Sequence, residues 1–116
     1  KAFPSIEAIF DPKNIKDHSD NYLQAFIYSH IVRIKQQQPA HEVSPALLFI
    51  QHAGGDNYDP TLVLDKEPVN DIATIDDHFI ELLTEKIEEI FNPDVSFNPT
   101  NDRARCLSCP YAALCR

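Results

Sequence analysis

The chain of 116 residues contains no methionine, no tryptophan and only two glycines. It also has no apolar run near the roughly 20 residues that a membrane-spanning helix needs. Its first residues lack the cationic start and the apolar core of a secretory signal. The three cysteines are an odd number, so with no visible export signal we expect a reducing, cytoplasmic setting. Because methionine is absent, we expect an excised part of a longer protein, with trimming after expression as the alternative.

Positive charge is also scarce, and the formal net charge is -8. By itself this balance argues against a free-standing nucleic-acid binder, which should be basic. The charge is unevenly placed, however. Residues 75–91 carry six acidic side chains and one lysine, a net charge of -5, whereas residues 101–116 carry three arginines and one aspartate, a net charge of +2. The C-terminal residues therefore form a small basic island.

Hydrophobic periodicity predicts two amphipathic helices. The first spans residues 19–37 after a loop at residues 1–18 that contains a short turn, and Ser19 or Asp20 caps it. The second spans residues 74–91, with Thr74 and Asp77 as a capping box. Proline ends both helices, at Pro39 and Pro93. The apolar stripes are Leu23, Phe26, Ile27, Ile31 and Ile34 in the first helix and Ile75, Phe79, Leu82, Leu83, Ile87, Ile90 and Phe91 in the second.

Residues 46–64 are predicted to hold two strands. Ala46–Gln51 is a nearly continuous apolar run, typical of an inner strand with both faces covered. Thr61–Leu64 is β-branched and is expected to pair back on it, beyond a turn-forming segment that contains both glycines. Helix, two strands, helix and a cysteine tail at residues 101–116 make an incomplete sheet. We therefore predict an α/β fold with pieces missing on its N-terminal side.

Every cysteine lies in the ending "CLSCPYAALCR", at C-x2-C-x5-C spacing. Thiolates at x2 spacing can both reach one metal ion, and Cys115 can fold back toward Cys106 and Cys109. A tetrahedral centre needs a fourth ligand, which the tail does not supply. Spacing alone leaves zinc and an iron–sulfur cluster open. The alternative to a metal site is three unrelated reduced thiols or one adventitious disulfide. Pro110 is expected to begin a short last helix.

Gln24 and Tyr28 stand four residues apart on the first predicted helix, so their side chains are neighbours on one face. A glutamine amide offers a donor and an acceptor, and a tyrosine hydroxyl can donate to a phosphate oxygen. Taken alone, the pair is more typical of a boundary glutamine and a tyrosine that packs its ring on the core.

Other polar residues have structural interpretations. Arg33 and Lys35 are expected to interact with the last carbonyls of their helix. The five histidines are dispersed, and His30 beside the apolar stripe is typical of a hydrogen-bonded core residue. Asp56, Asp59 and Asp65 could hold Mg²⁺ but are more typical of turns. No G-x-S-x-G, phosphate-binding glycine loop or H-E-x-x-H motif is present, so the residues alone assemble no catalytic set.

Taken together, the segments "DNYLQAFIYSHIV" and "FNPTNDRARCLSCPYAALC" resemble one family. The first is similar to the Q-x3-Y helix of PD-(D/E)xK nucleases of the RecB/AddB type. The second is similar to the C-x2-C-P-Y-x3–4-C ending of their iron–sulfur subgroup. The resemblance extends from about Ser19 to Cys115 and implies a partial restriction-endonuclease-like core.

The resemblance implies a DNA nuclease with Mg²⁺ or Mn²⁺ held by an aspartate and an (Asp/Glu)-x-Lys motif on two strands. No such motif lies on a predicted strand before Gln24, so the catalytic acids are expected to be absent and this chain alone inactive. Gln24 and Tyr28 would be accessory residues that contact DNA. Cys106, Cys109 and Cys115 would bind a [4Fe–4S] cluster in the intact protein, with a fourth cysteine from upstream. In the chain alone, we expect no cofactor to be bound.

The implied setting is a bacterial helicase–nuclease or exonuclease in recombination and double-strand-break repair, with a helicase subunit or domain as a possible partner. Two alternatives remain. One is a nuclease-like scaffold that has lost catalysis. The other is a small zinc module that binds a protein partner through its acidic helix.

Overall fold

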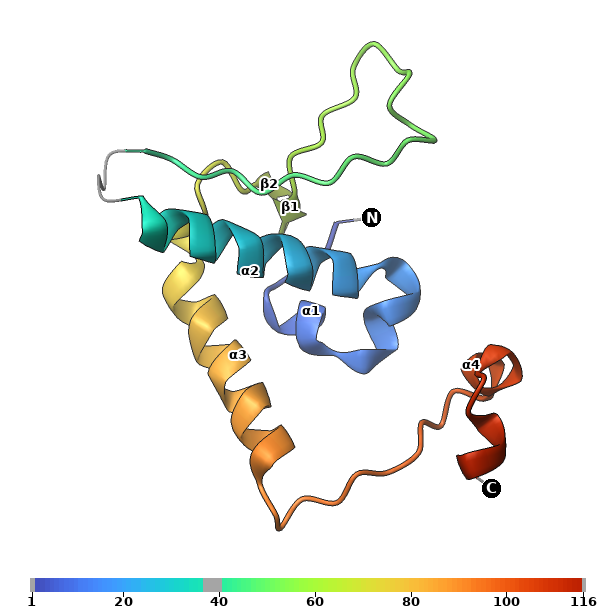
Figure 1. Cartoon of the computed structure of the whole chain (residues 1–116). Helices are drawn as coiled ribbons and strands as arrows, with labels where there is room; N and C mark the ends of the chain where they lie inside the picture. The colour runs from blue at the N-terminus through green and yellow to red at the C-terminus, as the bar shows by residue number, and fades with distance from the viewer. Residues whose placement is uncertain (1, 37–40, 116) are drawn as a thin grey trace. The chain divides into compact units, whose positions relative to one another are not determined.

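The computed structural model describes residues 2–36 and 41–115 (Figure 1). The predicted helix end at residue 37 and the stop at Pro39 lie outside the described residues. The chain divides into two compact units, residues 1–86 and 87–116, which we describe separately. Among the described residues, no helix is long and apolar enough to span a membrane.

The sequence predicts a loop with a short turn before residue 19. The structure has two short helices there. Helix α1 spans Glu7–Phe10 and the 3-10 helix η1 spans Pro12–Asp17. The Asp11 carboxylate accepts a hydrogen bond from the Lys13 N–H over 2.9 Å, and Pro12 has the φ angle that a first helical position needs. These local signals favour η1, whereas the sequence analysis assigned residues 12–17 to a loop.

Helix α2 spans Ser19–Lys35, as its periodicity predicts. The predicted cap is wrong, because Ser19 lies inside the helix and is buried, and His18 precedes the helix without a side-chain cap. The buried residues of α2 are Ser19, Tyr22, Phe26 and Ser29. The stripe is thus shifted from the predicted one, and Ile31 and Ile34 are exposed. A serine fits this face because the Ser29 hydroxyl donates to the Ala25 carbonyl over 2.8 Å.

The sheet is a short antiparallel hairpin of β1, Val63–Leu64, and β2, Glu67–Pro68. Its two-residue turn is Asp65–Lys66, with φ of 46° and 68°. Turns with both φ angles positive match the twist of a tight hairpin. The sequence did not predict β2 because this turn lacks the glycine or asparagine that usually marks it. Phe3 adds a parallel bridge to Leu64.

The apolar run Ala46–Gln51 is not the inner strand that the sequence predicts. Among residues 2–36 and 41–115, its one β-bridge is the antiparallel pair of Ala46 and Thr61, and a turn begins at Ile50. The Tyr58 hydroxyl accepts from the Phe49 N–H over 2.7 Å and donates to the Leu47 carbonyl over 2.9 Å. The Tyr58 side chain thus hydrogen-bonds to backbone groups that a neighbouring strand would otherwise bind. The Leu48 and Ile50 side chains are exposed, unlike those of an inner strand.

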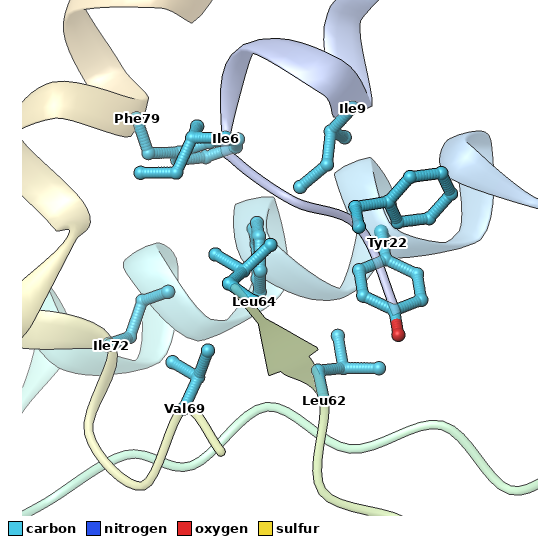
Figure 2. Packing of buried hydrophobic residues seen from close by; sticks show 10 residues of the cluster. Ile6, Ile9, Tyr22, Leu62, Leu64, Val69, Ile72 and Phe79 are labelled. Atoms are coloured by element: carbon cyan, nitrogen blue, oxygen red, sulfur yellow. The ribbon is translucent and has the colours of Figure 1, made fainter. Parts of the chain in front are cut away.

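Helix α3 spans Asp76–Phe91 and follows the 3-10 helix η2, Ile72–Thr74. The predicted cap at Thr74 is wrong, because its hydroxyl donates to the Asp71 carbonyl over 2.9 Å and Thr74 lies within η2. α1, α2, the hairpin, η2 and the first turns of α3 enclose the core of the first unit (Figure 2). Its buried apolar residues are Phe3, Ile6, Ile9, Tyr22, Phe26, Leu62, Leu64, Val69, Ile72 and Phe79.

The second unit has little apolar burial. The predicted stripe of α3 is exposed at its C-terminal end, at Ile87, Ile90 and Phe91. After a segment without regular structure, helix α4 spans Arg103–Ser108 and the 3-10 helix η3 spans Ala112–Cys115. The predicted short last helix is present as η3, but it begins at Ala112 and not at Pro110. The sequence did not predict α4, which the Asp102 carboxylate caps by accepting from the Ala104 N–H over 3.1 Å.

Candidate functional site

Gln24 and Tyr28 interact directly on the exposed face of α2. The Gln24 amide nitrogen Nε2 donates to the Tyr28 hydroxyl oxygen over 2.9 Å. Both side chains are exposed, so neither serves the core. The Tyr28 ring is therefore not packed on the core, and contact of the pair with DNA stays a prediction.

A groove of about 340 Å³ runs beside this pair, between α2 and the segment 43–47. We call it the Gln–Tyr groove. Its α2 wall includes Asn21, Gln24, Tyr28 and Val32. The Tyr28 oxygen accepts from Gln24, so the hydroxyl proton remains available to donate outward, and the Gln24 carbonyl oxygen remains an acceptor. The hydrogen bond from Gln24 also polarises the hydroxyl and makes it a better donor. The pair is therefore suited to an anionic oxygen or a base edge.

The three cysteines are free thiols in the second unit. Cys106 lies in α4 and is half-buried, and Cys115 lies in η3 and is exposed. Cys109 follows α4, and its N–H donates to the Cys106 carbonyl over 3.4 Å. Within residues 2–36 and 41–115, no three His, Cys, Asp or Glu side chains are gathered into a metal-binding group. Ligation by the three cysteines stays a prediction.

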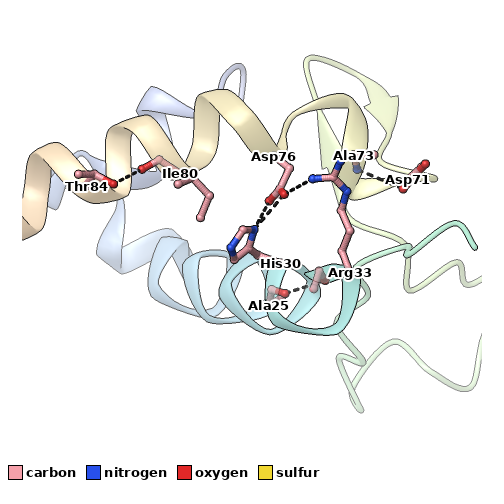
Figure 3. Close-up of polar contacts among 9 residues, drawn as sticks. Ala25, His30, Arg33, Asp71, Ala73, Asp76, Ile80 and Thr84 are labelled. Atoms are coloured by element: carbon pink, nitrogen blue, oxygen red, sulfur yellow. Dashed lines mark hydrogen bonds and ion pairs between the residues drawn. The ribbon is translucent and has the colours of Figure 1, made fainter. Parts of the chain in front are cut away.

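A buried ion-pair network, which the sequence analysis missed, joins α2 to α3 (Figure 3). The Asp76 carboxylate is 1% exposed. It accepts from His30 Nδ1 over 2.9 Å and from the Arg33 guanidinium over 2.5 Å. The prediction that Arg33 interacts with the last carbonyls of its helix is wrong, because Arg33 binds Asp76. His30 is hydrogen-bonded, as its position beside the apolar stripe predicts. Both donors lie on the side of α2 away from Gln24 and Tyr28, so the network fixes the rotation of the helix.

A second ion pair joins α1 to α3 at the surface. His78 Nε2 lies 2.5 Å from a Glu7 carboxylate oxygen, and His78 Nδ1 lies 3.6 Å from Glu81. The hydrogen bond from His78 lowers the pKa of Glu7 to about 2. The same bond raises the pKa of His78 above its ordinary value. Because both side chains are about half-exposed, solvent screens this pair.

Three other acidic residues, Asp11, Asp59 and Asp65, have structural roles. Asp59 accepts from the Thr61 N–H over 2.9 Å, and this bond lowers the pKa of the Asp59 carboxyl. Asp65 forms the hairpin turn. Asp11-Pro12-Lys13 has the spacing of an (Asp/Glu)-x-Lys motif but lies at the start of η1, where Asp11 caps the Lys13 N–H. It is therefore a helix signal and not a strand-borne metal motif.

A family model described as the PD-(D/E)XK nuclease superfamily matches residues 9–116. The chain belongs to the PD-(D/E)XK nuclease superfamily. No curated protein and no solved structure matches it. The mixture of helices with a small two-stranded sheet is compatible with part of the nuclease fold. Membership in the superfamily indicates a nuclease-like function, and the match includes the Gln–Tyr groove and all three cysteines.

Proposed function

We propose that this chain binds DNA for a metal-dependent nuclease of the RecB/AddB type. In this proposal the parent protein hydrolyses phosphodiester bonds as part of a helicase–nuclease or exonuclease in double-strand-break repair. The observation that carries the proposal is the exposed Gln24–Tyr28 hydrogen bond beside a groove, within a chain that the superfamily model matches over residues 9–116.

Within the Gln–Tyr groove, the Tyr28 hydroxyl donates to a backbone phosphate oxygen. The Gln24 amide orients that hydroxyl, and its carbonyl oxygen accepts from an exposed base edge. The Asp76 network holds α2 against α3 from the opposite side, so the pair keeps its orientation when DNA binds. These residues bind and orient DNA, and they transfer no proton in the hydrolytic step.

A divalent ion, when bound, lowers the pKa of the attacking water and offsets charge at the phosphorus centre. The described carboxylates of this chain do not fit such an ion, because they are dispersed and several cap helices or turns. We therefore assign Mg²⁺ or Mn²⁺ to acidic residues other than these. The thiol set is chemically suited to iron or zinc, and we propose that Cys106, Cys109 and Cys115 hold a [4Fe–4S] cluster with a fourth ligand.

DNA affinity tests this function. Fluorescence anisotropy with labelled single-stranded DNA would compare the wild type with Tyr28→Phe, which removes only the hydroxyl. We expect a loss of roughly ten-fold, because a hydrogen bond to a charged group contributes about 1.5–3 kcal/mol. The matched control is Tyr111→Phe, since Tyr111 is equally exposed but lies outside the groove. Equal affinities of the two variants would contradict the assigned contact.

A further inference from the structure

A second groove adjoins the Gln–Tyr groove. It has a volume of about 660 Å³ and lies between η1, the start of α2 and the segment 48–52. Asn21 lines both grooves, so they meet at this side chain. Together they form one track along α2, from Val32 at one end to Lys16 at the other.

The lining of the second groove combines aromatic, cationic and hydrogen-bonding groups. The rings of His18 and Phe49 lie with their centroids 6.2 Å apart. Lys16 supplies an exposed ammonium group, and Asn21 and His52 supply side-chain donors and acceptors. Aromatic rings beside a cationic group are the combination by which proteins bind single-stranded nucleic acids. Asp17 also lines the groove, so Lys16 is the lining residue whose charge suits a phosphate.

We infer that the second groove binds single-stranded DNA, with Lys16 on a backbone phosphate and the His18 and Phe49 rings against a base. The inference rests on the proposed function, because it continues the strand held at Gln24 and Tyr28. A duplex hides its base faces in the stack, so only an unpaired strand offers them to these rings.

The length of the track sets the length of strand that it holds. Between His18 and Val32, a helical rise of about 1.5 Å per residue gives about 21 Å. At about 3.4 Å per stacked nucleotide, this corresponds to about six nucleotides. A short oligonucleotide therefore fills only one groove, whereas a longer one fills both.

Two variants test the second groove without removing core residues. Lys16→Gln removes the phosphate contact, and Lys13→Gln is its matched control, because Lys13 is an exposed lysine of the same helix η1 that does not line the groove. His18 has a φ of 66°, in the left-handed region. Asparagine tolerates that conformation, so His18→Asn removes the ring while the backbone is retained.

The measurement is the affinity for labelled oligothymidylates of about four and about eight nucleotides over a salt series, by fluorescence anisotropy. With the longer strand, we expect Lys16→Gln to reduce the slope of log affinity against log salt by about 0.7, as for the loss of one phosphate contact. We expect His18→Asn to weaken its binding by roughly five-fold or more. Either variant should affect the shorter strand less, because that strand can still bind in the Gln–Tyr groove, and Lys13→Gln should change neither slope nor affinity.

The outcomes separate this inference from the proposed function. If Lys16→Gln behaves as Lys13→Gln does while Tyr28→Phe lowers the affinity for both strands, the second groove does not bind DNA and the proposed function stands. If Lys16→Gln and His18→Asn weaken binding while Tyr28→Phe changes the affinity for neither strand, the second groove binds DNA and the contact at Tyr28 is wrong. Binding of neither strand would contradict both.

Discussion

The Arg33 guanidinium donates to the Asp76 carboxylate over 2.5 Å, and this contact joins two helices whose residues lie 43 positions apart. His30 donates to the same carboxylate over 2.9 Å. Asp76 is almost fully buried, whereas Arg33 and His30 are partly exposed. A buried carboxylate is tolerated here because two side chains replace the water that it loses. The network therefore orients α2, and with it the Gln–Tyr groove.

Replacing Asp76 with alanine should destabilise the chain by about 1–3 kcal/mol, because Arg33 and His30 lose their acceptor. We place the loss below the range for fully buried pairs, since Arg33 can turn toward solvent. Urea unfolding followed by circular dichroism measures this loss. Asp77→Ala is the control, because Asp77 is the next residue of α3 and is exposed. An equal effect of both variants would show that the network adds nothing.

The sequence indicates the helices but not this network. Apolar residues at steps of three and four predict α2 and α3 to within a few residues of their ends. A hydrogen bond between side chains of two different helices leaves no periodic pattern in the sequence. From the sequence, Asp76 therefore looks like any other acidic residue at a helix N-terminus. Only the spacing of His30 and Arg33 hints that both face the same way.

The Glu7–His78 pair makes stability depend on pH. The pKa of His78 is raised, so its contribution is complete below its ordinary pKa of 6.5 and is lost as pH rises through the raised value. The pKa of Glu7 is lowered from 4.5 to about 2, so its contribution is complete above 4.5 and is lost as pH falls toward 2. The stability difference between the wild type and Glu7→Gln should therefore be greatest between pH 4.5 and 6.5.

Urea midpoints of both proteins from about pH 2 to about pH 9 check this dependence, because the range includes the ordinary pKa values of both groups, 4.5 and 6.5. Added salt should reduce the difference, because the pair is exposed. Glu85→Gln is a suitable control, since Glu85 is an exposed residue of α3 that makes no hydrogen bond or ion pair with His78. A difference that stays constant over the whole pH range would mean that the pair does not titrate as described.

The apolar run Ala46–Gln51 shows why part of the fold escaped the sequence analysis. Apolar composition predicts burial, and a strand also needs a partner for its N–H and carbonyl groups. The Tyr58 hydroxyl supplies that partner at Phe49 and Leu47. Conversely, the hairpin at residues 63–68 forms through a turn of Asp65 and Lys66. Both residues have positive φ angles, which their residue types do not predict. The Q-x3-Y pair could be predicted because Gln24 and Tyr28 stand four residues apart on one predicted helix.

The cysteine tail makes a spectroscopic prediction. If Cys106, Cys109 and Cys115 bind a [4Fe–4S] cluster in the intact protein, protein purified without oxygen should absorb near roughly 400 nm and contain iron. Cys109→Ser should remove most of that absorbance, whereas Ser108→Ala, at the preceding residue, should retain it. Zinc at one equivalent without this absorbance would instead favour a zinc site.

The most direct test of the account is cleavage of single-stranded DNA by the purified protein that contains these 116 residues, with Mg²⁺ present. The account predicts metal-dependent cleavage that Gln24→Ala and Tyr28→Phe reduce by roughly ten-fold or more at subsaturating DNA, as for the loss of one charged hydrogen bond. Tyr111→Phe should leave the rate unchanged. Cleavage that is the same in all four proteins would contradict a role for the Gln–Tyr groove, and the absence of metal-dependent cleavage in the wild type would contradict the nuclease itself.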